Sequence, residues 1–339
     1  MERTTPMASP LPPDTYEPIL EPELPIIDPH FHFFTGRGHE FGAAEFLAHA
    51  GSGHRILGAV HVEANADFFA DGGAAGEMRF AAAQGAKMRQ MQAGRERICD
   101  PVMGIVGYAD LRASDLEDQL DKLVEASGGR LRGIRNSAAW DPSPDVRNGH
   151  TDPPRHLLRD PAFRAGLGRL AKRGLAYDAY VLFHQLDELA ELADAVPDAQ
   201  IVCDHLGGII GVGRHKGRHA AYFDDWSAGL ARLAERPNVT LKLGGMAMSA
   251  AGFGWHKRGR PLGSEEYAAF YAPWFDHAIG VFGPTRCMFE SNFPVDGVAI
   301  SYAALWNGFK RLAAGYGDAE KDALFQGTAT RVYRLGGAR

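Results

Sequence analysis

The feature that most constrains the fold is the alternation of short apolar, β-rich runs with longer helical patterns along nearly the whole chain. The apolar runs have the length of buried strands, and each stretch between them carries apolar residues at spacings of three and four. Eight such units favour an α/β fold, a parallel sheet closed into a (β/α)8 TIM barrel, over an open doubly wound sheet. The strand candidates are residues 25–32, 54–64, 101–109, 131–137, 175–183, 200–206, 239–244 and 287–293.

Local signals support the helices between these strands. Asp160 followed by Pro161 predicts a capped helix start, because proline is tolerated in the first helical turn, and Gly174 predicts its end. No glycine-rich phosphate loop follows the first strand candidate, which disfavours a nucleotide-binding fold. The expected helices cover residues 77–93, 115–127, 161–173, 186–195, 225–235 and 265–282.

The alternation also sets the expected domain organisation. With 339 residues the chain is long enough for one large barrel, and the pattern predicts a single barrel domain over residues 25–339. Residues 1–24 carry six prolines and are expected to form an extended N-terminal arm. The chain start has no apolar core of signal-peptide length, and no stretch approaches a membrane span.

The net charge and the cysteine positions limit which binding partners and which cellular compartment are expected. A formal net charge of −6 gives no basic surface on average, so neither nucleic acid nor an acidic membrane is an expected partner. Cys99, Cys203 and Cys287 lie far apart, without the spacing of a zinc knuckle or a disulfide framework. We therefore expect a cytoplasmic protein that acts on a small molecule, and leave a homo-oligomer open.

Polar residues gather where the predicted strands end. In a TIM barrel the chemistry lies at the carboxyl ends of the strands, where the loops converge. A barrel with only a structural role would have little reason to direct histidines, acids and an arginine to one mouth. The residues at these ends are His30, His32, His61, Glu63, Tyr108, Asp110, Arg135, Asn136, Tyr180, His184, Asp204, His205, Lys242, Glu290 and Asn292, followed by Asp296.

Three histidines at these ends carry the sharpest hypotheses. Strand alternation places His30 and His32 on the same side, which makes half of a metal site. Two histidines that face solvent or lie in the core would give the same sequence pattern. His205 ends an apolar run beside Gly207 and Gly208. That position suits proton transfer, and it equally suits a hydrogen bond to a loop.

Seven motifs together resemble the amidohydrolase superfamily. They are DPHFH at 28–32, HVEA at 61–64, GIRNSAAWD at 133–141, CDHLGG at 203–208, KLGG at 242–245, GFGWH at 252–256 and FESNFPVD at 289–296. Within the superfamily the chain is similar to the amidohydrolase-2 branch of predicted metal-dependent TIM-barrel hydrolases, which includes sugar-acid lactonases and pyrone dicarboxylate hydrolase. The resemblance covers nearly everything except the arm.

The resemblance implies roles for individual residues. His30 and His32 match the pair that ligates a divalent metal, zinc for preference, and His184 is the nearest candidate for the histidine that completes the set. His205 matches the histidine that polarises the substrate or shuttles a proton. Asn292 stands where relatives usually present an aspartate that ligates metal and activates water.

Three departures from the family pattern leave two questions open: which metal the site binds, and whether it binds a metal at all. An amide such as Asn292 cannot take a proton from water and is a weaker ligand than a carboxylate. Around His184 the chain reads Phe-His-Gln-Leu where relatives read His-Pro-Gln-Leu, so a one-residue slip would turn the imidazole from the mouth. Asn136 stands where a histidine often follows the Gly-Ile-Arg motif.

The candidates for the base that Asn292 cannot supply are the carboxylates at the mouth: Glu63, Asp178, Asp204, Glu290 and Asp296. Glu63 lies between Val62 and Ala64, where partial desolvation would raise its pKa, but it could equally be the ion-pair partner of Arg135. Asp296 lies just past the last strand on a proline-bounded turn and suits either a movable ligand or a loop cap.

The substrate-binding candidates are Arg135, Asn136, Tyr180, Trp255 and His256. Arg135 is the best anchor for an anion, because a guanidinium binds a carboxylate through two hydrogen bonds; an ion pair with a barrel acid is the alternative. Trp255 and His256 lie in a long loop with Gly252 and Gly254, which suits a lid over a ligand or an oligomer contact.

The leading hypothesis is a hydrolase of the lactonase type. Water would attack the carbonyl of a lactone or ester of a small carboxylated ring compound, polarised by a metal or by histidines alone. A metal-dependent non-oxidative decarboxylase of an aromatic or unsaturated acid is the alternative. A barrel that has lost catalysis and only binds a small ligand is a second alternative, suggested by Asn292 and His184.

Overall fold

The protein is a barrel of eight parallel strands. The computed structural model describes residues 9–12, 17–35, 40–64, 73–93, 102–146, 148–149 and 151–336. Each strand pairs in parallel with the next along the chain, and a parallel bridge between Phe31 and Phe293 joins the two ends of the sheet. The strands are β1 (Pro25–Phe31), β2 (Arg55–Val62), β3 (Gly104–Gly107), β4 (Leu131–Ile134), β5 (Ala176–Ala179), β6 (Ile201–Cys203), β7 (Val239–Leu243) and β8 (Cys287–Phe289).

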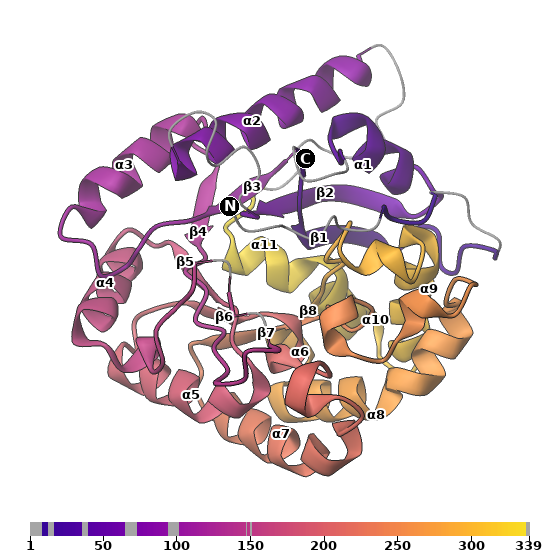
Figure 1. Ribbon diagram of the computed structural model, residues 1–339. Coiled ribbons are helices and arrows are strands. Elements are labelled where there is room, and N and C mark those ends of the chain that lie inside the picture. The colour runs from indigo at the N-terminus through magenta and orange to yellow at the C-terminus, as the bar shows by residue number, and fades with distance from the viewer. Residues whose placement is uncertain are drawn as a thin grey trace.

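Helices surround this sheet, which makes the (β/α)8 TIM barrel that the alternation predicts (Figure 1). The Asp160 side chain accepts hydrogen bonds from the amides of Ala162 and Phe163, so the predicted cap is confirmed. The helices are α1 (Ala43–Ala50), α2 (Ala74–Met91), α3 (Leu116–Ala126), α4 (Pro161–Lys172), α5 (Leu186–Ala195), α6 (His205–Gly208), α7 (His219–Ala234), α8 (Ser264–Phe282), α9 (Tyr302–Leu312), α10 (Asp318–Asp322) and α11 (Thr328–Val332).

All eight predicted strands are present, and most are shorter at the mouth than predicted. β8 ends at Phe289, so Glu290 and Asn292 follow the strand rather than belong to it. The sequence patterns did not predict α1, α6, α9, α10 or α11. α9 has an amphipathic sequence, and the structure buries nearly all of its residues, Lys310 included.

The barrel interior begins with an apolar floor. Its members point inward from their strands and pack together with Tyr333, which follows α11. α11 covers the amino ends of the strands, where Thr328 bonds to the carbonyl of Thr285 just before β8. The floor is made of Ile27, Val60, Val62, Val106, Ala176, Val202, Met288 and Tyr333. Since side chains repeat every two residues, the next inward positions lie nearer the mouth.

The described parts of the N-terminal segment pack along the barrel. The amide of Leu11 donates to the carbonyl of Gly297 over 2.7 Å, and Lys310 donates to the carbonyls of Leu20 and Glu21 over 2.8 Å each. Residues 1–8 and 13–16 of the predicted arm lie outside the described residues, as does Cys99. The division into an arm and one domain therefore stays a prediction.

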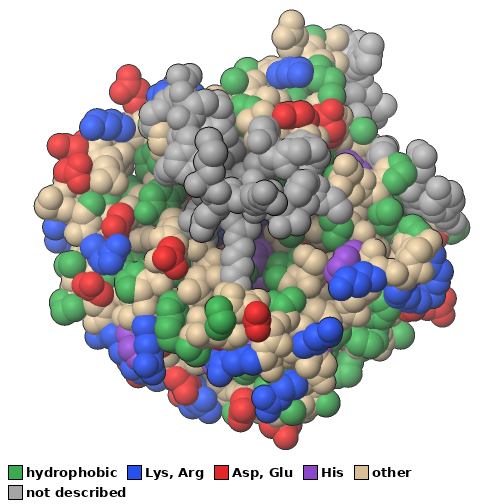
Figure 2. Space-filling model, viewed as in Figure 1, with side chains coloured by type: hydrophobic (Ala, Val, Ile, Leu, Met, Phe, Trp, Pro, Cys, Tyr) green, Lys and Arg blue, Asp and Glu red, His purple; other side chains and the backbone are tan. Residues whose placement is uncertain are grey.

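Two surface findings bear on partners. Acidic and basic side chains are interspersed on the face seen in Figure 2, without one large patch of a single sign. Among the helices of the described ranges, none has the length and apolar character needed to span a membrane.

Candidate active site

His30 and His32 form the centre of the barrel mouth. Both side chains are buried, and their Nε2 atoms lie 3.2 Å apart. Nδ1 of His32 lies 2.8 Å from the carbonyl oxygen of Val62 and must donate to it, so Nε2 of His32 keeps its lone pair. Burial, together with Lys242 beside His30 and Arg135 beside His32, holds the pKa of both imidazoles well below the usual range. Both rings are therefore neutral, as a metal ligand requires.

A ring of charged side chains stands directly above the apolar floor. Asp178, Asp204 and Glu290 each follow a floor residue by two positions, and Lys242 holds the corresponding place on β7. The ammonium of Lys242 lies 2.6 Å from Asp178, 3.2 Å from Asp204 and 3.1 Å from Nδ1 of His30. Burying charged groups costs free energy even when they are paired. A charged layer at this depth therefore indicates a functional role.

His205 is oriented by Glu290. Oε1 of Glu290 lies 2.7 Å from Nδ1 of His205 and also accepts its backbone amide, while Oε2 lies 2.7 Å from Nδ1 of His30. Burial alone lowers the pKa of His205, but the Glu290 carboxylate outweighs it and raises the pKa above its ordinary value. With Nδ1 engaged, Nε2 of His205 is the nitrogen left for a substrate.

The backbone around His205 is held in an uncommon conformation. His205 and Leu206 both have left-handed φ, at 53° and 52°, and Gly207 and Gly208 continue it. Left-handed φ is unfavourable for a residue with a Cβ atom and persists where the surrounding structure fixes it. Gly245 has a φ of +73°, and a Cβ there would lie 2.7 Å from Cβ of His205, so the close approach of β7 requires glycine.

Arg135 and Glu63 form a buried ion pair. Nε of Arg135 donates to Oε1 of Glu63 over 2.7 Å, and Nη2 donates to the carbonyl oxygen of Glu63. Burial by itself lowers the pKa of Arg135, but Glu63 and Asp204 raise it above the usual value. Of the two alternatives for Glu63, the geometry favours the partner of Arg135. The guanidinium still reaches the site, since Nη1 lies 3.4 Å from Nε2 of His30.

Asn292 and Asp296 are joined to each other. The amide of Asn292 donates to Oδ1 of Asp296 over 2.9 Å, and the backbone amide of Ala247 donates to Oδ2 over 3.0 Å. Burial raises the pKa of Asp296 to about 7, although both hydrogen bonds oppose the rise. Asn292 thus has a carboxyl group beside it that titrates in the range useful for acid–base chemistry.

The remaining candidates lie at different distances from this centre. The ring of Tyr180 meets that of His205 edge-on with centroids 5.5 Å apart, so Tyr180 belongs to the mouth. Asn136 is buried and accepts the amide of Leu111. Trp255 packs against α8, where its Nε1 donates to Tyr271, and His256 beside it is exposed.

His184 is not brought to His30 and His32. It lies instead with Asp141 and His215, in loops that follow β5, β4 and β6. The one-residue slip noted in the sequence has the expected effect, because Nε2 of His184 faces the carbonyl oxygen of Trp140 at 3.1 Å. The other metal-ligand candidates, His30 and His32, remain together.

The residues at the centre fit a divalent cation. Asp204 lies within reach of His30 and His205 as a further ligand, and neither of its carboxylate oxygens makes a hydrogen bond to a described residue. Two permanent cations, Arg135 and Lys242, lie among the buried carboxylates Glu63, Asp178, Asp204 and Glu290. An ion on His30 would compete with Nη1 of Arg135 for the same nitrogen.

Sequence reasoning placed Glu290 at a strand end as one of several candidate bases, and gave Lys242 at its strand end no role. The signal for Glu290 was its two-residue spacing from Met288, which directs it inward like Asp204 after Val202. Lys242 was marked only by its place in an otherwise apolar strand.

A family model described as Amidohydrolase matches residues 27–335. The chain belongs to the amidohydrolase family. An uncharacterised protein of Sinorhizobium fredii, y4mH, is 31% identical across 92% of this chain and 99% of its own length. The L-fucono-1,5-lactonase of Burkholderia multivorans is 32% identical across 71% of this chain and 75% of its own length.

A solved structure of an amidohydrolase from Burkholderia multivorans, with bound Zn, matches this fold with a TM-score of 0.69. Its identity is 25%, and the match covers 91% of this chain and 99% of that chain. The family and these relatives make the protein a hydrolase.

Proposed function

We propose that the protein hydrolyses a lactone or ester of a small carboxylated ring compound. The observation that carries the proposal is His205, whose Nδ1 is held by Glu290 at 2.7 Å beside His30 and His32. A histidine held in this way by a carboxylate can accept a proton at one nitrogen while the carboxylate stabilises the imidazolium that results.

The proton path follows from this pair. Nε2 of His205 takes a proton from water as the oxygen of that water adds to the lactone carbonyl. When the bond from the carbonyl carbon to the ring oxygen breaks, the departing oxygen receives the proton from His205. The product is a hydroxy acid, which ionises at neutral pH and releases one proton to the solution.

Charge at the mouth supports the developing oxyanion. Nη1 of Arg135 faces Nε2 of His30, so an oxygen bound near these two residues is stabilised electrostatically. A divalent ion on His30, held also by His32 or by Asp204, would add polarisation of the carbonyl when bound. Tyr180 supplies an aromatic wall beside His205.

Among the carboxylates that could assist, Asp296 suits the role better than Glu63. Glu63 is committed to Arg135, whereas Asp296 has a pKa raised to about 7 and bonds directly to Asn292. We therefore assign His205 as the main proton carrier and Asp296, with Asn292, as a supporting acid–base pair.

The substrate class is supported by the curated relative that hydrolyses a lactone, at 32% identity. A six-membered lactone of a sugar acid is the first compound to test. The cytoplasm stays the expected compartment, and the described cysteines, Cys203 and Cys287, are both free and buried.

The test is a panel of five- and six-membered sugar-acid lactones, followed with a pH indicator, beside aromatic acids assayed for CO₂. We expect acid release from at least one lactone, and a loss of about 10²- to 10⁴-fold in His205→Asn, the range for removal of a general acid–base group. His277→Asn is the matched control, since His277 bonds to the carbonyl of Ser227 on the outer helices.

Release of CO₂ with no lactone opened would establish the decarboxylase instead. Thermal stabilisation by small carboxylates without any turnover would establish the binding barrel. Full activity in His205→Asn would remove the proposed mechanism.

A further inference from the structure

A second cluster of metal-ligand side chains lies outside the site described above. Asp141, His184 and His215 come from the loops after β4, β5 and β6, and one ligand atom from each lies within 4.8 Å of the others. The Asp141 side chain is fully buried and that of His215 is one-tenth exposed. Their convergence is not explained by the proposed reaction.

The donor atoms have the spacing of a tetrahedral ion site. Nε2 of His215 lies 2.9 Å from Oδ2 of Asp141, and Nε2 of His184 lies 3.7 Å from the same oxygen. Bonds of about 2.1 Å in a zinc tetrahedron place neighbouring ligands about 3.4 Å apart, between these two values. The carbonyl oxygen of Trp140 lies 3.1 Å from Nε2 of His184, so an ion must compete with this contact for the nitrogen.

The ligands are held in place by their surroundings. Oδ1 of Asp141 accepts the amide of Ser143 over 2.8 Å, which leaves Oδ2 to face the two imidazoles. The rings of His184 and His215 are nearly parallel, with an interplanar angle of 12°, and Nε2 of each faces Oδ2 of Asp141. Supporting contacts of this kind orient the ligands of natural metal sites.

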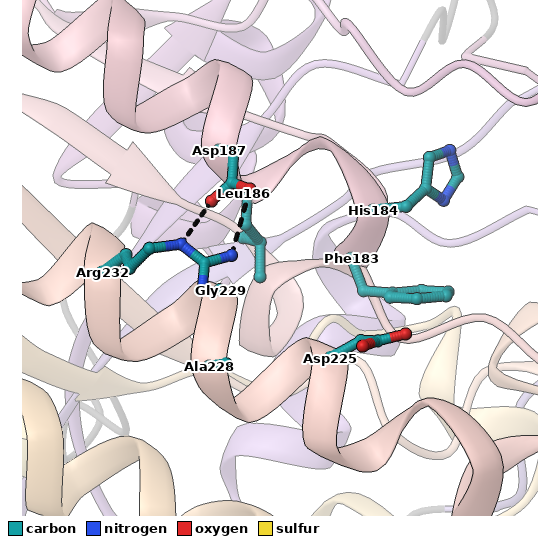
Figure 3. Close-up of a pocket in the computed structure, with 8 residues that line it drawn as sticks. All are labelled: Phe183, His184, Leu186, Asp187, Asp225, Ala228, Gly229 and Arg232. Atoms are coloured by element: carbon teal, nitrogen blue, oxygen red, sulfur yellow. Dashed lines mark hydrogen bonds and ion pairs between the residues drawn. The ribbon is translucent and has the colours of Figure 1, made fainter.

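An ion can reach the cluster from the surface. The His184 side chain is 26% exposed and lines a cavity of about 290 Å³ between α5 and α7. Figure 3 shows its ring directed away from the Asp187–Arg232 ion pair that lines the same cavity. The imidazole thus borders the surface and the cluster together.

Arg214 is the group that an ion must displace. Its guanidinium donates to Oδ2 of Asp141 over 2.8 Å, but the side chain is about half exposed and free to turn into solvent. Since Arg214 neutralises the carboxylate when no ion is bound, removing it should strengthen ion binding. A cluster that served only as an ion pair would give no such gain.

We propose that Asp141, His184 and His215 bind a divalent transition-metal ion, zinc by preference, in a site separate from His30 and His32. The ion joins three loops at the rim of the barrel. It stabilises the fold there and takes no part in the proposed hydrolysis.

The test uses the full chain with His30→Asn and His32→Asn, so that the central pair cannot bind, and titrates Zn²⁺ by calorimetry. We expect one ion per chain, and at least about 100-fold weaker binding in His215→Phe, since even residues that only support a ligand contribute 10- to 100-fold. Arg214→Gln should bind up to about fivefold tighter, the worth of an exposed ion pair. His219→Phe is the control, because His219 bonds to Ala251 outside the cluster.

A second measurement tests the site without the His30→Asn, His32→Asn variant, in case that variant does not fold. Zinc content per chain and the rise in melting temperature with Zn²⁺ are compared between the wild-type protein and His215→Phe. A lower zinc content and a smaller rise in His215→Phe support the site. Equal content and equal rise overturn it, as does a folded background variant that binds no ion.

Discussion

Oε1 of Glu290 lies 2.7 Å from Nδ1 of His205, and the other oxygen of the same carboxylate lies 2.7 Å from Nδ1 of His30. One acid therefore orients His205, which follows β6, and also lies against the ring of His30 on β1. The parallel barrel makes this possible, because β1 and β8 are neighbours across its closure.

Replacing Glu290 by glutamine should shift the pH dependence of catalysis. The Glu290 carboxylate raises the pKa of His205, so Glu290→Gln lowers it. The neutral base then persists to lower pH, and the acid limb of the kcat/KM profile moves to lower pH while the maximum rate falls. The measurement is kcat/KM for a lactone between pH 4.5 and 9.

Glu188→Gln is the matched control for this change. Glu188 also accepts from a histidine, His156, over 2.8 Å, but it lies in α5 on the outer face of the barrel. Its substitution should leave the profile in place. An acid limb that moves equally in both variants, or in neither, would contradict the assigned role of Glu290.

Replacing Gly245 by alanine should impair catalysis more than it impairs stability. The new Cβ would lie 2.7 Å from Cβ of His205 and push the imidazole from its position. A displacement of about 1 Å in a catalytic group can reduce the rate about 100-fold. We expect a fall of that order in kcat, together with a loss of about 1 kcal/mol of folding free energy from the left-handed φ.

Gly254→Ala separates the two effects. Gly254 has the same left-handed conformation, with a φ of +77°, but a Cβ there would meet nothing within 4 Å. It should show a similar loss in urea unfolding and near-normal kcat. If Gly254→Ala reduced kcat as much as Gly245→Ala does, the effect would be due to backbone strain and not to contact with His205.

The sequence predicted the barrel because its signals are local and repeated. Eight apolar runs, a proline beside an aspartate cap and glycines at helix ends each report on a few neighbouring residues. The convergence of His30, Arg135 and His205 then follows from the rule that strand ends meet at one mouth.

What the sequence could not decide depends on contacts between distant segments. Glu63 was equally good as a base or as the partner of Arg135, and only the 2.7 Å contact across β2 and β4 separates them. His184 lies in the turn at Phe183–Gln185 after β5 and faces the carbonyl oxygen of Trp140, a contact between two loops that no local pattern reports. Asp296 titrates near 7 because of burial, which no local pattern reports.

Breaking the Arg135–Glu63 pair should be strongly destabilising. Removal of one partner leaves a buried charge unpaired, which costs about 3–5 kcal/mol of the free energy of unfolding. Glu63→Gln should therefore show a loss of that size in urea unfolding, and Glu63→Gln with Arg135→Met should lose less than the sum of the two single variants. Asp187→Asn, which breaks the exposed pair with Arg232, should cost at most about 1 kcal/mol.

Introducing the family's aspartate at position 292 should make stability depend more steeply on pH. In Asn292→Asp a second carboxyl group would stand beside Oδ1 of Asp296, where the amide nitrogen now lies at 2.9 Å. Like charges that close raise the pKa of the pair further above the value of about 7 that burial gives Asp296. A folded-state pKa above the unfolded value of 3.8 means that stability is complete below pH 4 and is lost as the pH rises through 7.

The variant should therefore match the wild-type protein near pH 4 and unfold at progressively lower urea concentration between pH 5 and 8. The exchanged variant, Asn292→Asp with Asp296→Asn, restores one amide and one carboxyl group. Its new amide can still accept from Ala247, so it should recover most of the wild-type dependence. If Asn292→Asp lost the same stability at pH 4 as at pH 8, the cause would be packing rather than charge, and the pairing of Asn292 with a titrating Asp296 would be wrong.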